Sequence, residues 1–104
     1  MTPTERTLKW LKEMGWPYAK CEHWNPFAHI RQDLFGLFDY LALDDKQGVL
    51  GIQISGYTGI GKHITKMQTK PVLEEWKKRG NRALVIGWRK AGTPARWESR
   101  QVYL

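Results

Sequence analysis

Apolar and polar positions in the first third of the chain predict a helix, a short strand and a loop. Thr2, Pro3 and Glu5 form a typical capped helix start, and Gly15 is a typical helix end. The apolar stripe between them consists of Leu8, Leu11 and Met14. Residues 18–24 then read as a strand that ends at Asn25-Pro26, and we expect a loop from there to Gly36.

Two apolar runs follow, and a polar residue interrupts each of them. Residues 36–43 are almost continuously apolar, which is typical of a strand covered on both faces, but Asp39 lies in the middle. A carboxylate in such a place loses hydration unless a metal ion, a cation or several donors replace the water. In residues 49–55, Gln53 and Ser55 share one face of the predicted strand.

The turn-rich segment 44–48 has hairpin length, so the two runs should pair in antiparallel fashion. If Leu43 and Val49 form the last pair before the turn, Asp39 lies opposite Gln53, and Leu37 opposite Ser55. Opposed residues share a face with Cβ atoms roughly 4.5–5.5 Å apart. This register predicts that the acid and the amide converge, whereas a slip of one residue would separate them.

The rest of the chain predicts two helices and two strands. After a glycine-rich turn at 56–61, helical patterns cover 62–69 and 72–79, the second closed by Gly80. Residues 83–88 read as a buried strand, and 97–104 as a final one. The expected order is α-β-β-β-α-β with one further strand, in a single domain spanning 1–104.

Composition narrows the classes of partner. Seventeen Lys and Arg against ten Asp and Glu give a net charge of +7, which favours a polyanionic partner. The single cysteine, Cys21, excludes an internal disulfide and a multi-cysteine zinc site. With no run long enough to span a bilayer and no signal peptide, we expect a reduced, cytoplasmic protein without a membrane partner. Most of the six tryptophans should fill the core and its rim, with base stacking by one or two as the alternative.

One segment imitates a nucleotide-binding loop. Residues 56–62 match the glycine and lysine positions of a phosphate-binding P-loop after a strand and before a helix. The next position requires Ser or Thr for magnesium and is His63 instead, and the strand ending at Trp88 carries no acid for the second magnesium contact. A tight turn leaving the strand is the preferred interpretation.

The element order and the Asp39/Gln53 pair resemble the PD-(D/E)xK nuclease superfamily, in its small branch similar to Holliday-junction resolvases. The resemblance runs through RQDLFGLFD at 31–39, through Gln53-Ile54-Ser55 and into the helix that holds Lys66. It implies an α/β restriction-endonuclease-like core, with a mixed central sheet flanked by helices. In the family motif an acid stands at the position of Gln53 and a lysine at that of Ser55; Gln-x-Ser resembles variants in phage and bacterial members.

The resemblance implies a magnesium- or manganese-dependent DNA endonuclease, acting on branched or other DNA in a bacterial or phage-infected cytosol, and possible pairing as a homodimer. The metal ligands would be drawn from Asp39, Gln53, the Ile54 carbonyl, Asp33 and Glu22. The catalytic residues would be Asp39, Gln53, Ser55 and Lys66. The nucleic-acid contacts would be Arg31, Lys62, His63, Lys66 and Lys70, three of which follow one helix face at four-residue spacing.

Structural roles compete with each of these assignments. Asp39 would serve equally in a buried ion pair with Arg31 or a lysine, and Gln53 with Ser55 in a polar network that fixes strand register. The lysine stripe fits a solvated helix face. The alternative function is therefore a catalytically inactive nuclease-fold module that binds nucleic acid or a protein partner.

Overall fold

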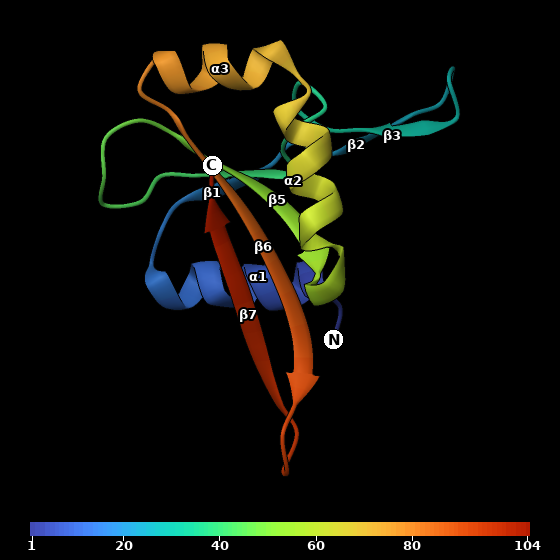
Figure 1. The fold of residues 1–104 in the computed structure, drawn as a ribbon, viewed down its shortest axis with the longest axis vertical. Coiled ribbons are helices and arrows are strands. Elements are labelled where there is room, and N and C mark those ends of the chain that lie inside the picture. Colours follow the sequence, from blue (N-terminus) through green and yellow to red (C-terminus); the bar gives the residue numbers. More distant parts are fainter.

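A five-stranded mixed sheet forms the centre of the computed structural model, which describes all of residues 1–104 (Figure 1). The sheet strands lie in the order β1 (Tyr18–Lys20), β4 (Tyr40–Ala42), β5 (Leu50–Gly56), β6 (Arg82–Ala91) and β7 (Arg96–Tyr103). Only β5 and β6 are parallel. The chain between them crosses over through a 3-10 turn (Tyr57–Gly59), α2 (Ile60–Gln68) and α3 (Pro71–Lys78). The chain is thus one small α/β domain with three helices.

The helix α1 (Pro3–Met14) covers one face of the sheet and lies behind the strands in Figure 1. Its ends are those predicted: Thr2 and Glu5 form the capping box, and Gly15 ends the helix at a φ of 74°. Leu11 packs there with Ile52, Ile54 and other strand residues in a buried cluster. The sequence did not predict a buried hydroxyl on this face, that of Thr7. It accepts a hydrogen bond from the Trp88 indole at 2.9 Å.

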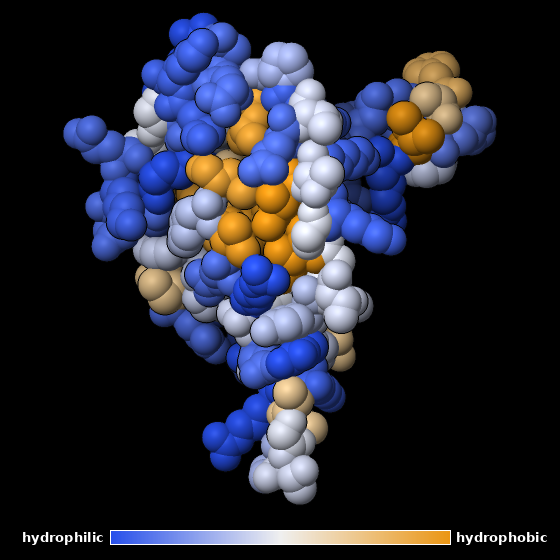
Figure 2. Space-filling model, viewed as in Figure 1, coloured by the Kyte–Doolittle hydropathy of each residue, from blue (hydrophilic) through white to orange (hydrophobic).

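The helices α2 and α3 cover the other face. Leu37, Phe38, Ile60 and Val85 belong to the buried cluster on that side. Since successive residues of a strand face opposite sides, the isoleucines of β5 point toward α1, and Gly51, Gln53 and Ser55 point toward α2. Figure 2 shows apolar side chains exposed on this near face, between α2 and the end of β7.

A second, two-stranded sheet projects from the body. The strands β2 (His23–Asn25) and β3 (Ile30–Gln32) pair only with each other and form an arm at the side of the molecule (Figure 1). We call residues 23–32 the β2–β3 arm. The expected strand at 18–24 is therefore two strands, divided at Cys21 and Glu22, and the expected loop up to Gly36 was wrong because it contains β3.

The remaining predictions hold with shifted boundaries. Both expected helices and both expected C-terminal strands are present, and β6 is longer than predicted at both ends. The strand expected at 36–43 is reduced to β4, because a tight turn bridged between Leu34 and Phe38 occupies its first residues. Phe35 and Gly36 both have positive φ there, 58° and 67°, as in a type I′ turn. No helix is long and apolar enough to cross a membrane.

Candidate functional site

The Asp39 side chain lies where the β4–β5 ladder ends. The last backbone bond there runs from the Asp39 N–H to the Ile52 carbonyl at 2.8 Å. The next free N–H of β5, that of Ile54, donates to Asp39 Oδ2 at 3.0 Å instead. Gln53 Nε2 donates to the same oxygen at 3.1 Å. The carboxylate thus accepts the hydrogen bond that a backbone carbonyl would accept if the ladder continued beyond the start of β4.

The predicted register is confirmed in its main consequence. Tyr40 pairs with Ile52, and continuing that register places Asp39 opposite Gln53, whose side chains are in contact. The expected pairing of Leu37 with Ser55 was wrong, because the chain turns at Leu34–Phe38 before reaching it. The polar pair is therefore at the end of the ladder and not inside a continuous strand.

Asp39 has no basic partner. The ion pair with Arg31 that the sequence left open is absent, because Arg31 instead meets Glu22 at 2.9 Å. The pKa of Asp39 is raised to about 6, first by burial and then by the nearby charges of Glu22 and Asp33, even though the hydrogen bond from the Ile54 N–H lowers it.

The neighbouring groups experience the same negative potential. Burial raises the pKa of the Cys21 thiol, and Asp39 and Asp33 add to the rise. The pKa of Tyr40 is raised by burial and then by Glu22 and Asp39. The N–H groups of Cys21 and Glu22 both donate to the Asp39 carbonyl, at 2.8 and 3.2 Å, which ties the start of the β2–β3 arm to this site. Three acids therefore share one small region with no cation on Asp39.

The polar residues of β5 are hydrogen-bonded within the protein. Gln53 Nε2 lies 3.1 Å from Asp39 Oδ2 and 3.3 Å from the Ile54 carbonyl oxygen, so the amide nitrogen stands between the two oxygens expected to hold a metal. The Ser55 hydroxyl donates to the Gly56 carbonyl at 2.7 Å. Ser55 is also pressed against Gly59, where an added Cβ would lie 2.8 Å from Ser55 Oγ. Ser55 is thus buried, and its hydroxyl bonds within its own strand.

The donor set fits a hard divalent cation once the Gln53 amide turns over. No three His, Cys, Asp or Glu side chains are gathered as a ready metal cage. Mg²⁺ does not require one, since it is often held by one or two carboxylates together with water and substrate phosphate. Asp39 offers its carboxylate and Ile54 its carbonyl, and a turned amide would present Gln53 Oε1 where Nε2 now lies. Glu22 and Asp33 supply further negative charge beside them.

The basic residues expected on α2 are only partly available. Lys62 and Lys66 are exposed and make no ion pair, and His63 is half-buried. Lys70 differs, because its ammonium group donates to the Gly36 carbonyl at 2.9 Å and is partly buried. It joins the end of α2 to the Leu34–Phe38 turn, which is a structural role. The lysine stripe therefore has two free members, not three.

The P-loop-like segment does not form a phosphate cradle. Residues 57–59 make a 3-10 turn and α2 starts at Ile60, so the tight turn out of the strand is confirmed. Glycine is required at Gly59 by the close approach of Ser55, and at Gly87 on β6 because a Cβ there would lie 2.6 Å from Ile60. These glycines serve packing.

Sequence reasoning missed the exposed aromatic residues of the β2–β3 arm. Phe27 is 95% exposed and Trp24 56%, and Trp24 is the one tryptophan of six that is largely exposed. The other five lie in or at the rim of the core, as predicted. The segment WNPF contained the signal, because Asn-Pro between two aromatic residues marks a turn that presents them.

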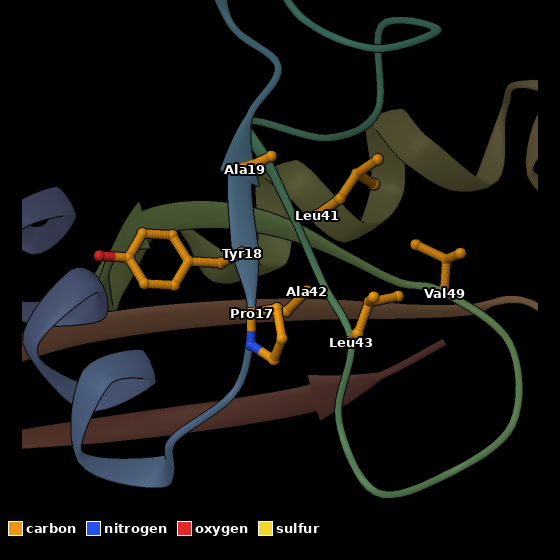
Figure 3. A pocket seen from close by; sticks show the side chains of 7 residues that line it. All are labelled: Pro17, Tyr18, Ala19, Leu41, Ala42, Leu43 and Val49. Atoms are coloured by element: carbon orange, nitrogen blue, oxygen red, sulfur yellow. The ribbon is translucent and has the colours of Figure 1, made fainter.

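Two surface hollows differ in polarity and in their relation to the acidic site. The first, of about 300 Å³, lies at the β1 edge of the sheet and is almost wholly apolar (Figure 3). It is lined by Pro17, Tyr18, Ala19, Leu41, Ala42, Leu43 and Val49, a set with no acid, base or thiol. The second, of about 410 Å³, is polar and lies at the base of the β2–β3 arm, where Arg31, Asp33 and Phe35 are among its lining residues. Only the second is lined by a residue of the acidic site.

Comparison with known protein families, with curated proteins and with solved structures finds no match for this chain.

Proposed function

We propose that this protein is a metal-dependent DNA endonuclease with a restriction-endonuclease-like core, similar to the small resolvase-like branch of the PD-(D/E)xK superfamily. The observation that carries the proposal is Asp39: a largely buried carboxylate, flanked by Glu22 and Asp33, with no basic partner and with a pKa raised to about 6. Such an arrangement is unfavourable at neutral pH unless a cation joins it.

The residues would divide the work as follows. Asp39, the Ile54 carbonyl and a turned Gln53 amide would hold Mg²⁺ or Mn²⁺, with Glu22 or Asp33 as the second carboxylate. The metal, when bound, activates water and neutralises charge on the scissile phosphate. Lys66 and Lys62, exposed on α2, contact the DNA backbone and take over the charge of the missing strand lysine.

A cleavage assay tests the proposal directly. Labelled single-stranded, duplex and four-way-junction DNA are incubated with Mg²⁺, Mn²⁺ or EDTA, with Asp39→Asn beside the wild type. The expected result is metal-dependent cutting that Asp39→Asn abolishes. Lys12→Gln is the matched control, because Lys12 is exposed on α1 and that helix covers the other face of the sheet. Absence of cutting on all substrates, with both metals, would contradict the proposal.

The alternative is a catalytically inactive module of the same fold that binds nucleic acid or a protein partner. The observation that favours it is the internal satisfaction of β5: Gln53 Nε2 already bridges Asp39 and Ile54, and Ser55 bonds its own strand. Under this alternative the protein binds DNA with unchanged affinity in EDTA and in Mg²⁺, and Mn²⁺ does not raise its melting temperature.

A further inference from the structure

The β2–β3 arm presents aromatic side chains that folding does not require. Phe27 at its tip is 95% exposed, and Trp24 and Ile30 are about half exposed. The orange and tan side chains at the end of the arm stand apart from the body in Figure 2. Exposed apolar side chains gathered on one projecting element make it a candidate binding site.

The tip is held in one conformation by its own polar groups. Asn25 Oδ1 accepts from the N–H groups of Phe27 and Ala28 at 3.0 and 3.1 Å, and Asn25 Nδ2 donates across the arm to Gln32 at 3.2 Å. His29 has a φ of 54°, an uncommon conformation for a residue with a side chain, and its ring meets Trp24 edge-on with centroids 6.3 Å apart. The backbone that carries these aromatic side chains is thus held in one conformation before any ligand arrives.

The arm starts and ends at the acidic site. Glu22 directly precedes it and Asp33 directly follows it, and both raise the pKa of Asp39. The polar hollow at its base is lined by Arg31, Asp33 and Phe35. A ligand seated at Asp39 therefore lies beside the foot of the arm.

We propose that the β2–β3 arm stacks Phe27 and Trp24 against unpaired bases of the nucleic acid strand whose backbone lies at the Asp39 site. This inference rests on the proposed function, which supplies nucleic acid as the ligand and the Asp39 site as the place of its backbone. Residues 23–32 contain no carboxylate, and the chain as a whole carries +7, so a polyanion such as nucleic acid is favoured over a basic or neutral partner. Exposed aromatic rings serve as stacking platforms for unpaired bases. Such stacking tolerates any sequence, because every base has a π-face.

An anionic lipid surface is the competing ligand for an aromatic arm, and the geometry disfavours it. If the tip inserted into the membrane, Glu22 and Asp33 at the foot of the arm would approach the anionic headgroups. The like charges would repel each other, because an anionic membrane supplies no cation of its own between them. In a nucleic acid complex the same acids would hold a divalent cation, which would neutralise the charge of the phosphate. The protein should therefore prefer strands with single-stranded, bulged or branched segments over perfect duplex.

Binding in Ca²⁺, in place of Mg²⁺ or Mn²⁺, tests the inference separately from cleavage, because a hard cation then neutralises the acids beside the phosphate. Fluorescence anisotropy compares one DNA sequence as single strand, as duplex and as a duplex with a bulge that contains 2-aminopurine. The variants are Phe27→Ala, Phe27→Leu and Phe27→Tyr, with Tyr103→Ala as a control for loss of an exposed aromatic residue outside the arm. Because Phe27 is almost fully exposed, none of its substitutions leaves a cavity.

The expected result is a loss of affinity for single-stranded and bulged DNA of roughly 5- to 150-fold in Phe27→Ala and in Phe27→Leu. Duplex binding should change little, Phe27→Tyr and Tyr103→Ala should match the wild type, and quenching of 2-aminopurine should disappear with the aromatic ring. Equal affinities in Phe27→Ala and wild type, or full rescue by Phe27→Leu, would overturn the inference. So would a lack of any DNA binding, or Phe27-dependent binding only to phosphatidylglycerol vesicles. Base stacking without any cleavage in Mg²⁺ would contradict the proposed nuclease and leave the arm's role standing.

Discussion

At the scale of single residues, the Asp39 carboxylate lowers the stability of the fold at neutral pH when no cation is bound. Its native pKa of about 6 lies above the value of about 3.9 expected in the unfolded chain. Between these values the native state binds more protons than the unfolded state, so stability falls as pH rises through this window. Asp39 is thus destabilising above about pH 6 unless a cation binds.

The first prediction follows from that sign. Asp39→Asn keeps an oxygen for the Ile54 N–H and removes the charge, so in EDTA it should be more stable than the wild type at pH 8. We expect a gain on the order of 1 kcal/mol, since partial exposure screens much of the shift. The gain should vanish near pH 4. Urea unfolding of both proteins at the two pH values measures it, and a wild type more stable than the variant at pH 8 in EDTA would contradict the prediction.

The second prediction concerns Gln53. Gln53→Glu restores the acid of the nuclease motif but replaces the donor to Asp39 Oδ2 with another negative charge. In EDTA at pH 8 the variant should lose about 1–3 kcal/mol of stability. With Mn²⁺ it should bind the metal more tightly than the wild type and recover the loss, as a rise in melting temperature would show.

Gln53→Met is the matched control, because it removes the same hydrogen bond without adding a charge. It should be destabilised in EDTA and should gain nothing from Mn²⁺. If Gln53→Glu and Gln53→Met respond alike to the metal, then position 53 does not face a cation.

At the scale of elements, the packing of the Leu34–Phe38 turn onto β5 determines where Asp39 can lie. The Phe38 ring covers Gly51, where an added Cβ would come within 2.6 Å of the ring. Trp76 of α3 holds the ring from the other side, with centroids 4.8 Å apart. The glycine allows the ring to lie flat on the strand, and that contact fixes the turn next to the site.

The third prediction tests this packing. Gly51→Ala should lower the free energy of unfolding by about 1–3 kcal/mol, because the ring is confined on both sides. Gly56→Ala on the same strand is the control: nothing lies within 4 Å of its Cβ, and its φ of −68° suits any residue. Urea unfolding should separate the two variants, and equal stabilities would show that Phe38 moves aside freely.

The sequence was informative about elements wherever local chemistry determines them. The Thr2/Glu5 capping box and the Gly15 end of α1 are local, and the structure confirms both. The Asp39–Gln53 contact was predictable because the length of the 44–48 turn limits the register of the two strands. These signals act over a few residues and require no knowledge of the rest of the fold.

The parts that failed depend on distant partners. The strand β2 was predicted only as the end of a longer first strand, and β3 as loop. Both are three residues long and, lying outside the main sheet, lack the alternating pattern of a half-buried strand. Lys70 looked like a member of a charged stripe, and only the tertiary fold brings it to the Gly36 carbonyl. Arg31 likewise forms its ion pair with Glu22 and not with Asp39, which local sequence does not indicate. Whether the site is catalytic stays a prediction.

At the scale of the whole molecule, the excess of positive charge is spread over both faces, while the acidic site lies on one. Lys62 and Lys66 on α2 are exposed and free of ion pairs on the face of the sheet toward which Gln53 points. Lys9 and Lys12 on α1 are also exposed but lie on the opposite side of the sheet. Under the proposed function, we expect a DNA strand that reaches the acidic site to pass α2 and not α1.

The fourth prediction compares the lysine pairs on the two faces. Lys62→Gln with Lys66→Gln, and Lys9→Gln with Lys12→Gln, remove the same charge from the two faces. Each lost phosphate contact should lower the slope of log affinity against log salt by roughly 0.7 to 0.9. The α2 double variant should therefore lose up to roughly 1.4 to 1.8 in slope, twice the value for one contact. The α1 double variant should keep the wild-type slope, and anisotropy titrations over a salt series measure both. Equal losses in the two variants would mean that the +7 charge attracts DNA without a preferred face, and the DNA path past α2 would then be wrong.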